Sequence, residues 1–87
     1  MKSIELIITD EAGLHARPAS LVCKEAAKYN SKLELVYNDK AINLKSILGV
    51  MSLGVPHEAT ITVRAEGDDA EDALKNIEKA FKDNKLV

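Results

Sequence analysis

The sequence contains little cysteine, few aromatic residues and no excess of basic charge. Cys23 is the single cysteine, so no disulfide can form within the chain and no thiolate cluster can bind a metal. Two tyrosines, one phenylalanine and a formal net charge of −2 do not supply the basic, base-stacking surface that is typical of nucleic-acid-binding proteins. We therefore expect no metal, no cofactor and no direct contact with nucleic acid.

Long hydrophobic runs are also absent. No apolar run approaches the roughly 18 residues that a membrane span needs, and no signal peptide precedes the first predicted strand. We expect a cytoplasmic protein without membrane insertion. The length of 87 residues suffices for one domain with a modest core, but not for a catalytic cleft between two lobes. Residues 1–87 are therefore predicted to form a single domain that works with partners.

Hydrophobic periodicity predicts the secondary structure. Apolar and polar side chains alternate in four segments, residues 3–9, 33–37, 41–44 and 59–66, and the pair Asn38-Asp39 favours a hairpin between the second and the third. Helical spacing covers residues 16–29, 46–53 and 70–84. The order β-α-β-β-α-β-α, with strands that are polar on one side, indicates a two-layer α+β domain. Its antiparallel sheet is expected to carry all the helices on one face.

The motif Gly-Leu-His-Ala-Arg-Pro-Ala at residues 13–19 places His15 at the start of a predicted helix. A helix N-terminus presents unpaired backbone N–H groups and a positive dipole end, which suit a phosphate. An ordinary histidine titrates near pH 6.5, so one ring nitrogen can act as a nucleophile near neutrality. His15 is therefore a candidate acceptor of a phosphoryl group.

The residues after His15 fit the same chemistry. The backbone N–H groups of Ala16 and Arg17 lie in the first turn, where they can point at phosphate oxygens, and the Arg17 guanidinium offers a charged donor fork. Pro18 lacks an N–H at a position where none is required. The alternative interpretation is that His15 only caps the helix and that Arg17 is a solvated surface charge.

A second motif covers residues 43–54 and reads Asn-Leu-Lys-Ser-Ile-Leu-Gly-Val-Met-Ser-Leu-Gly. Ser46 is a predicted N-cap and Gly54 a predicted C-terminal glycine of a short helix. Its many apolar side chains cannot all be buried in so small a domain, so part of the helix is expected to form a docking surface. The alternative is that Val50 and Leu53 belong to the core and the remaining exposure is incidental.

Together the two motifs resemble the HPr family, the histidine-containing phosphocarriers of the bacterial phosphoenolpyruvate-dependent sugar phosphotransferase system. The resemblance covers essentially the whole chain. It implies an open-faced β-sandwich with a four-stranded antiparallel sheet in the order 1-4-2-3 and three helices. It also implies that His15 receives a phosphoryl group from phosphorylated enzyme I on its pros nitrogen, Nδ1, and passes it to the IIA domains of sugar permeases. Arg17 then neutralises the phosphate, and the chain is a carrier and not an enzyme.

The same resemblance implies a docking face and a regulatory site. The docking residues are Ser20, Leu21, Ile47, Leu48 and Met51. The sequence around Ser46 is similar to the form of low-GC Gram-positive bacteria, in which the matching serine is phosphorylated by an ATP-dependent HPr kinase/phosphorylase. The phosphorylated form acts there with the catabolite control protein. We expect Ser46 to be such a site, in a monomeric chain.

The sequence departs from the family pattern at two places. Ala12 stands where the family often has a small polar residue, and Val-Pro-His-Glu at residues 55–58 replaces a glycine-containing turn, which predicts a stiffer loop. His57 is expected in that loop, on the surface, without a phosphoryl or metal role. Cys23 is expected to be a small helix residue without redox chemistry, because no second thiol is present.

Three alternative functions stay open at this point. One is a regulatory paralogue without carrier function, although such proteins typically lack the histidine. Another is a carrier of the nitrogen-related branch, against which the sequence Lys-Ser-Ile at residues 45–47 argues. The third is a non-catalytic interaction module in which an apolar patch binds partners and His15 is only a helix cap.

Overall fold

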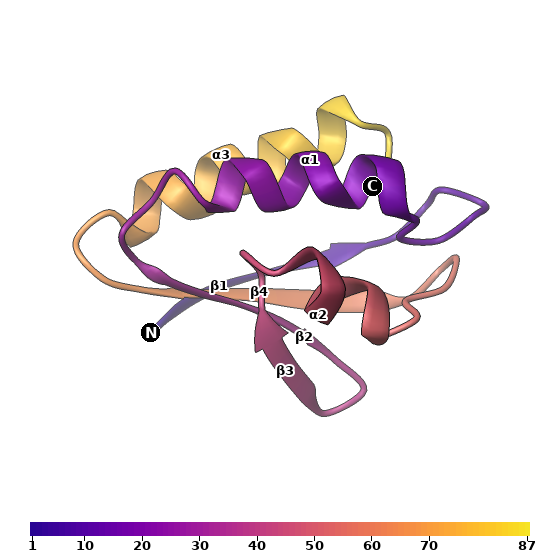
Figure 1. The fold of residues 1–87 in the computed structure, drawn as a ribbon, viewed down its shortest axis with the longest axis horizontal. Coiled ribbons are helices and arrows are strands. Elements are labelled where there is room, and N and C mark those ends of the chain that lie inside the picture. The colour runs from indigo at the N-terminus through magenta and orange to yellow at the C-terminus, as the bar shows by residue number, and fades with distance from the viewer.

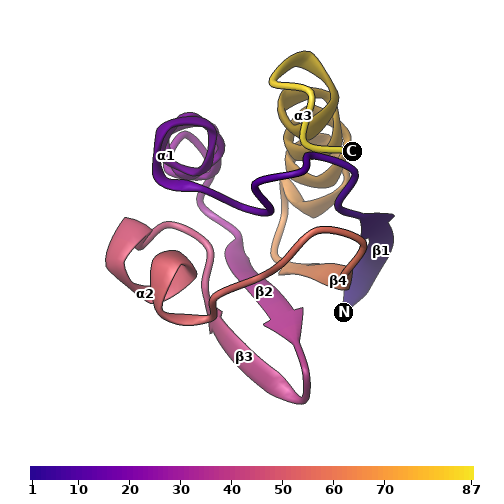
Figure 2. The ribbon, with the colours of Figure 1, turned by 90° about the vertical axis from the view of Figure 1, so that its right-hand side faces the viewer.

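The computed structural model describes all 87 residues and has the predicted β-α-β-β-α-β-α order. The strands β1 (Lys2–Ile7), β2 (Lys32–Tyr37), β3 (Lys40–Asn43) and β4 (Thr60–Glu66) form an antiparallel sheet in the order β1-β4-β2-β3. The helices α1 (Ala16–Ala26), α2 (Ile47–Ser52) and α3 (Ala70–Asp83) cover one face of this sheet (Figures 1 and 2). The predicted two-layer open-faced β-sandwich is confirmed.

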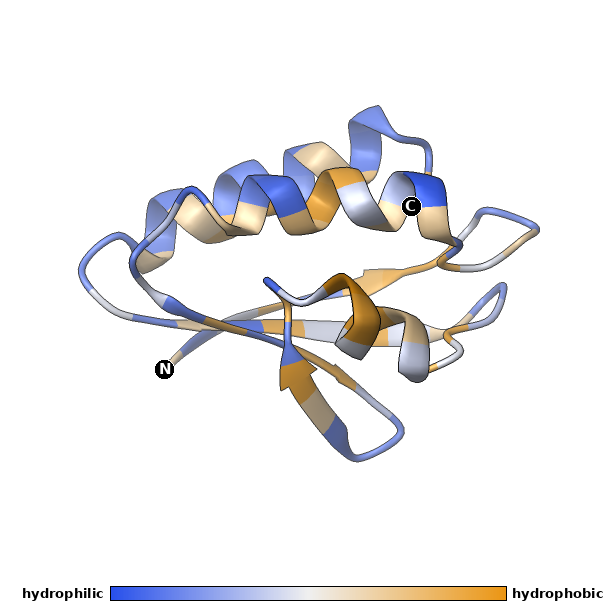
Figure 3. Ribbon diagram, in the orientation of Figure 1, coloured by the Kyte–Doolittle hydropathy of each residue, from blue (hydrophilic) through white to orange (hydrophobic).

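The core lies between the sheet and the helices. In β4, Ile61, Val63 and Ala65 are fully buried, whereas the alternate residues of the strand face the open side of the sheet (Figure 3 shows this alternation as colour). Ile7 interrupts the polar pattern of the first strand because it lies on the open face, where it is 57% exposed. The prediction that one sheet face meets solvent is confirmed.

Two elements end two or more residues before their predicted ends. β1 stops at Ile7, although Ile8 still pairs with the chain before β4: its N–H donates to the Ala59 carbonyl (2.9 Å) and its carbonyl accepts from the Glu58 N–H (2.7 Å). The next N–H, that of Thr9, donates to the Leu86 carbonyl (2.8 Å). α1 ends at Ala26, three residues before the predicted end, because the Tyr29 N–H donates to the Ala26 carbonyl in a tightened last turn (3.3 Å). The helical spacing of Tyr29 therefore reflects packing against the core rather than helix.

The hairpin between β2 and β3 turns through two residues. Asn38 (φ 52°) and Asp39 (φ 65°) both lie in the left-handed region, as a two-residue type I′ turn requires. The backbone of Asn and Asp tolerates this region better than that of other non-glycine residues. The turn predicted from the pair is confirmed.

Asp69 fastens the start of α3 to the turn before β2. It occupies the N-cap position of α3 without capping the helix. Its carboxylate instead accepts hydrogen bonds from the N–H groups of Asn30 (2.9 Å) and Ser31 (2.9 Å) and from the Ser31 hydroxyl. Gly67 makes this contact possible, since a Cβ at its position would lie 2.6 Å from Ser31 Oγ. The Ser31 hydroxyl and the Asn30 N–H lower the pKa of Asp69.

This interaction predicts a specific sensitivity to acid. Because the pKa of Asp69 is lower in the folded than in the unfolded protein, its contribution is present above the unfolded value of about 3.9 and is lost as the pH falls through the folded value. Asp69→Asn is therefore expected to lower the thermal midpoint at neutral pH, and by progressively less below pH about 4. Melting curves followed by circular dichroism measure this difference. Asp68→Asn, at an exposed neighbour, is the matched control; a difference that does not vary with pH would contradict the assignment.

Candidate functional site

His15 stands at the entrance of α1 with its imidazole free of any capping role. The residue occupies the N-cap position with an extended backbone (φ −93°, ψ 167°), and its carbonyl accepts from the Ala19 N–H (3.0 Å). Its side chain makes no capping hydrogen bond, so the interpretation of the imidazole as a helix cap is wrong. The side chain is 44% exposed. The ring is therefore available to a partner.

The loop before His15 is shaped by Gly13. This residue has φ 71°, and a Cβ there would lie 2.4 Å from the Val55 carbonyl oxygen, so only glycine fits. The neighbouring Leu14 is buried, and its N–H donates to the same carbonyl (2.9 Å). Gly13 therefore lets the chain turn sharply against Val55 just before His15.

Asp10 contacts the His15 ring, and sequence reasoning did not identify it. Its Oδ2 lies 3.2 Å from His15 Nε2, and its Oδ1 accepts from the Ala12 N–H (2.8 Å). The Ala12 hydrogen bond and then the contact with His15 lower the pKa of Asp10. The available signal in the sequence was a carboxylate five residues before the histidine, but this spacing matches no helical or strand period.

A shallow open hollow of about 310 Å³ surrounds the ring. It is lined by Asp10, His15, Arg17, Pro18, Leu21, Asn84 and Lys85. Arg17 and Lys85 form no ion pair within the chain, so two cations without a carboxylate partner border the imidazole. The hollow therefore favours an anionic group beside His15.

The first turn of α1 adds two donors. The backbone N–H groups of Ala16 and Arg17 have no acceptor within the chain, and Pro18 has no N–H to satisfy. In an eleven-residue helix these groups also carry the positive end of the helix dipole. The predicted phosphate-binding groups thus lie next to His15 with their hydrogen-bonding capacity unused.

The end of the chain supports the site loop. The Leu86 carbonyl accepts from the N–H groups of Thr9 (2.8 Å) and Asp10 (3.4 Å), and the Leu86 side chain is fully buried. Figure 2, which views this end of the molecule, shows the start of α1 and the end of the chain after α3 close to the same loop. This support was not predicted from the sequence.

The docking residues implied by the resemblance lie on α1 and α2. Leu48 is 82% exposed, and Leu21 borders the His15 hollow. Ser20 and Ile47 line one small depression between the two helices. Met51 is partly buried against the core. The structure therefore leaves apolar surface exposed on both helices, and Figure 2 shows these helices side by side.

Ser46 has the predicted N-cap geometry. Its hydroxyl oxygen accepts from the Gly49 N–H (3.2 Å) at the start of α2. Gly54, just after the helix, has φ 61°, as predicted for a C-terminal glycine. Val50 is buried, whereas Leu53 is only partly buried. The helix therefore divides its apolar side chains between core and surface.

Comparison with known proteins identifies the family. The sequence model described as the PTS HPr component phosphorylation site matches residues 2–83. The phosphocarrier protein HPr of Mycoplasma capricolum is 42% identical over 87 residues, which cover all of this chain and 98% of that relative. The chain belongs to the HPr family. It is thus a phosphocarrier of the phosphotransferase system, whose partners include proteins such as enzyme I and IIA domains.

Solved HPr structures match this fold closely. The histidine-containing phosphocarrier protein of Mycoplasma superposes with a TM-score of 0.97 at 42% identity, over 99% of this chain and 98% of that one. An HPr from Thermoanaerobacter tengcongensis superposes with a TM-score of 0.91 at 39% identity, over 98% of this chain and 96% of that one. The strand order implied by the resemblance to HPr is therefore that of this chain.

Neither His57 nor Cys23 lines the hollow around His15 in this HPr-family chain. His57 is in an exposed loop, where its Nε2 lies 3.2 Å from Glu58 Oε1. Cys23 is buried, and burial raises the pKa of its thiol. No group of three or more His, Cys, Asp or Glu side chains is arranged to hold a metal ion.

No helix combines the length and hydropathy that crossing a bilayer requires.

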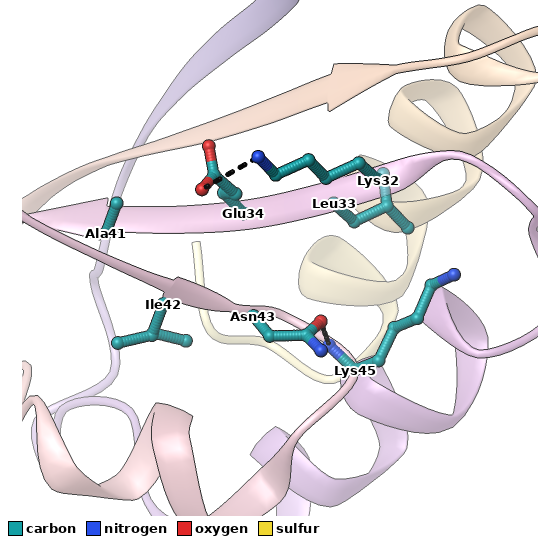
Figure 4. A pocket seen from close by; sticks show the side chains of 7 residues that line it. All are labelled: Lys32, Leu33, Glu34, Ala41, Ile42, Asn43 and Lys45. Carbon is teal, nitrogen blue, oxygen red and sulfur yellow. Dashed lines mark hydrogen bonds and ion pairs between the residues drawn. The ribbon is translucent and has the colours of Figure 1, made fainter.

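A second hollow of about 240 Å³ lies at the β2–β3 edge of the sheet (Figure 4). Its polar side chains already have partners within the chain: Lys32 Nζ lies 4.0 Å from Glu34 Oε2, Asn43 Oδ1 accepts from the Lys45 N–H (2.9 Å), and Lys45 Nζ donates to the Tyr29 carbonyl (2.7 Å). It contains none of the residues predicted to carry function. The His15 hollow is therefore the candidate site.

Proposed function

We propose that His15 accepts a phosphoryl group from phosphorylated enzyme I and passes it to the IIA domains of sugar permeases, with residues 1–87 acting as one HPr domain. The observation that carries this proposal is the exposed imidazole beside two unpartnered backbone N–H groups and two unpaired cations. A phosphate on His15 finds donors and positive charge already in place. A ring used only as a cap would need neither.

The phosphoryl group is proposed to form its bond with Nδ1, the pros nitrogen, as the resemblance to the family implies. The N–H groups of Ala16 and Arg17 then bind phosphate oxygens, and the Arg17 guanidinium neutralises their charge. Phosphoryl transfer needs mainly in-line positioning and charge stabilisation, so two proteins can supply one site between them. This is why a shallow hollow suffices.

The partners are proposed to dock on the apolar surface next to this hollow. Ser20, Leu21, Ile47, Leu48 and Met51 form the docking face. When a partner covers an exposed leucine such as Leu48, the complex is stabilised by about 25 cal/mol per Å² of apolar area buried. The same face serves enzyme I and IIA domains in turn, so docking to either must stay reversible.

Phosphate transfer from phosphoenolpyruvate in the presence of enzyme I tests the proposal. Trypsin places the two histidines in different peptides: His15 in residues 3–24, because Pro18 blocks cleavage after Arg17, and His57 in residues 46–64. An acid-labile phosphate is expected on the 3–24 peptide, and none when enzyme I is omitted. No label would instead support the interaction module in which His15 has no carrier role, and label on the 46–64 peptide would place the acceptor at a residue other than His15.

Ser46 is proposed to be a regulatory phosphorylation site for an ATP-dependent HPr kinase/phosphorylase, with the catabolite control protein as partner of the phosphorylated form. Support comes from the resemblance of the flanking sequence and from the position of the hydroxyl at the start of α2. A phosphate there meets the favourable end of the helix dipole, so the helix tolerates it. It also places negative charge beside Ile47 of the docking face.

Ser46→Asp is expected to slow phosphorylation of His15 by enzyme I about tenfold, mainly through weaker docking. The rate is measured as a function of enzyme I concentration, so that docking and transfer are separated. Ser46→Ala should keep the wild-type rate, and Ser3→Asp adds the same charge at an exposed position of β1. Equal rates for Ser46→Asp and the unmodified protein would count against the regulatory proposal.

A further inference from the structure

We propose that Asp10 is a positioning residue that holds His15 in the tautomer with the proton on Nε2, so that Nδ1 carries the free lone pair. This inference rests on the proposed carrier role of His15. It assigns a task to a residue that neither motif contains. It also gives a physical reason for the choice of ring nitrogen.

The geometry of the Asp10 carboxylate supports this role. One oxygen, Oδ1, is held by the Ala12 N–H (2.8 Å), which leaves Oδ2 facing His15 Nε2 at 3.2 Å. An ionised carboxylate can only accept hydrogen bonds, so the nitrogen that faces it must be the donor. An aspartate is ionised near neutrality, and the pKa of Asp10 is lowered further by the Ala12 N–H and by the contact with His15. A neutral imidazole carries one N–H, and with this proton on Nε2 the other nitrogen is unprotonated.

The consequence for transfer follows from the electron count. The Nδ1 lone pair forms the new bond to phosphorus while the bond from phosphorus to the donor atom of enzyme I breaks, its electron pair staying with the donor. The ring then carries the phosphoryl group on Nδ1, the proton on Nε2 and a positive charge. Asp10 faces that charge and stabilises it. A carboxylate that accepts from the non-reacting ring nitrogen does the same for other histidines that act through one nitrogen.

No other anionic side chain lines the hollow. Asp10 is the sole carboxylate among the lining residues, and the other charged side chains there are the cations Arg17 and Lys85. His57, on the neighbouring loop, is a further group whose charge acts on Asp10. The side chain of Asp10 is 24% exposed, so its contact with the ring is partly shielded from water.

Asp10→Asn tests the proposal while preserving the loop. The amide oxygen of asparagine can still accept from the Ala12 N–H, and the NH₂ group then stands opposite Nε2 as a donor. Nitrogen-15 NMR of the His15 ring at pH about 8.5, where an ordinary imidazole is neutral, reports the tautomer directly. The wild type is expected to show the proton on Nε2, and Asp10→Asn a shift towards Nδ1. Phosphorylation by enzyme I should slow about tenfold.

Glu11→Gln is the matched control, because it removes the same charge from an exposed neighbour that has no hydrogen bond to the ring. It should leave tautomer and rate unchanged. A proton on Nδ1 in the wild type, or an unchanged tautomer in Asp10→Asn with the Ala12 amide signal in place, would overturn the proposal. These outcomes are separate from the carrier role, which fails if the wild type takes up no phosphate.

Discussion

His15→Ala is expected to take up no acid-labile phosphate from phosphoenolpyruvate and enzyme I, while its thermal midpoint stays close to that of the wild type. Both expectations have the same structural origin. The imidazole is 44% exposed and makes no capping hydrogen bond, so its removal deletes the acceptor without removing support from α1. A true N-cap side chain would contribute about 1 kcal/mol to stability. Phosphate labelling and thermal melting on the same sample measure the two properties.

His57→Ala is the control for this experiment. His57 is the other histidine of the chain and lies in an exposed loop against Glu58. Its replacement should leave the label intact. Residual acid-labile phosphate on His15→Ala would place the acceptor elsewhere, and a large loss of stability would restore a structural role for the ring.

Phe81→Ala is expected to destabilise the fold by about 3–5 kcal/mol. The ring is fully buried on α3 between the helices and the sheet. Its loss removes transfer free energy and leaves a cavity that its neighbours fill only in part. A domain of this size has a free energy of unfolding on the order of 4–13 kcal/mol, so this substitution removes a large part of it. Urea denaturation with constant m-value measures the change.

Phe81→Leu provides the comparison for that variant. A leucine keeps most of the buried apolar volume, so the loss should be clearly smaller than for alanine. The order alanine, then leucine, then wild type in the urea midpoint follows from packing alone. A loss below about 1 kcal/mol for Phe81→Ala would show that the core can collapse around the site of the ring.

The secondary structure was predictable because it depends on local patterns. The alternation of apolar and polar side chains along residues 59–66 predicts a strand with one solvent-exposed face, and the Asn38-Asp39 pair predicts a turn that needs positive φ. Errors arose where a distant residue decides the outcome. After β1 the Thr9 N–H donates to the carbonyl of Leu86, seventy-seven residues further along the chain, and no local pattern carries that information. The strand order likewise came from the family resemblance and not from periodicity.

The site was predictable in part for the same reason. The position of His15 at a helix start and the unpaired N–H groups that follow are consequences of local sequence. The contact with Asp10 depends instead on the turn at Gly13 and on its fit against Val55, forty-two residues further along the chain. The placement of Lys85 depends on the end of α3. Pairwise geometry of this kind appears only when the fold is complete.

The pairing of β1 with β4, together with the hydrogen bonds that the Thr9 and Asp10 N–H groups donate to the Leu86 carbonyl, sets the order in which the site can form during synthesis. The histidine is made early, within the first fifth of the chain. Its loop acquires these contacts only after Leu86 has left the ribosome, because chains are made from the N-terminus at about 5–20 residues per second. A nascent chain therefore carries the phosphate acceptor for seconds without the geometry that makes it one.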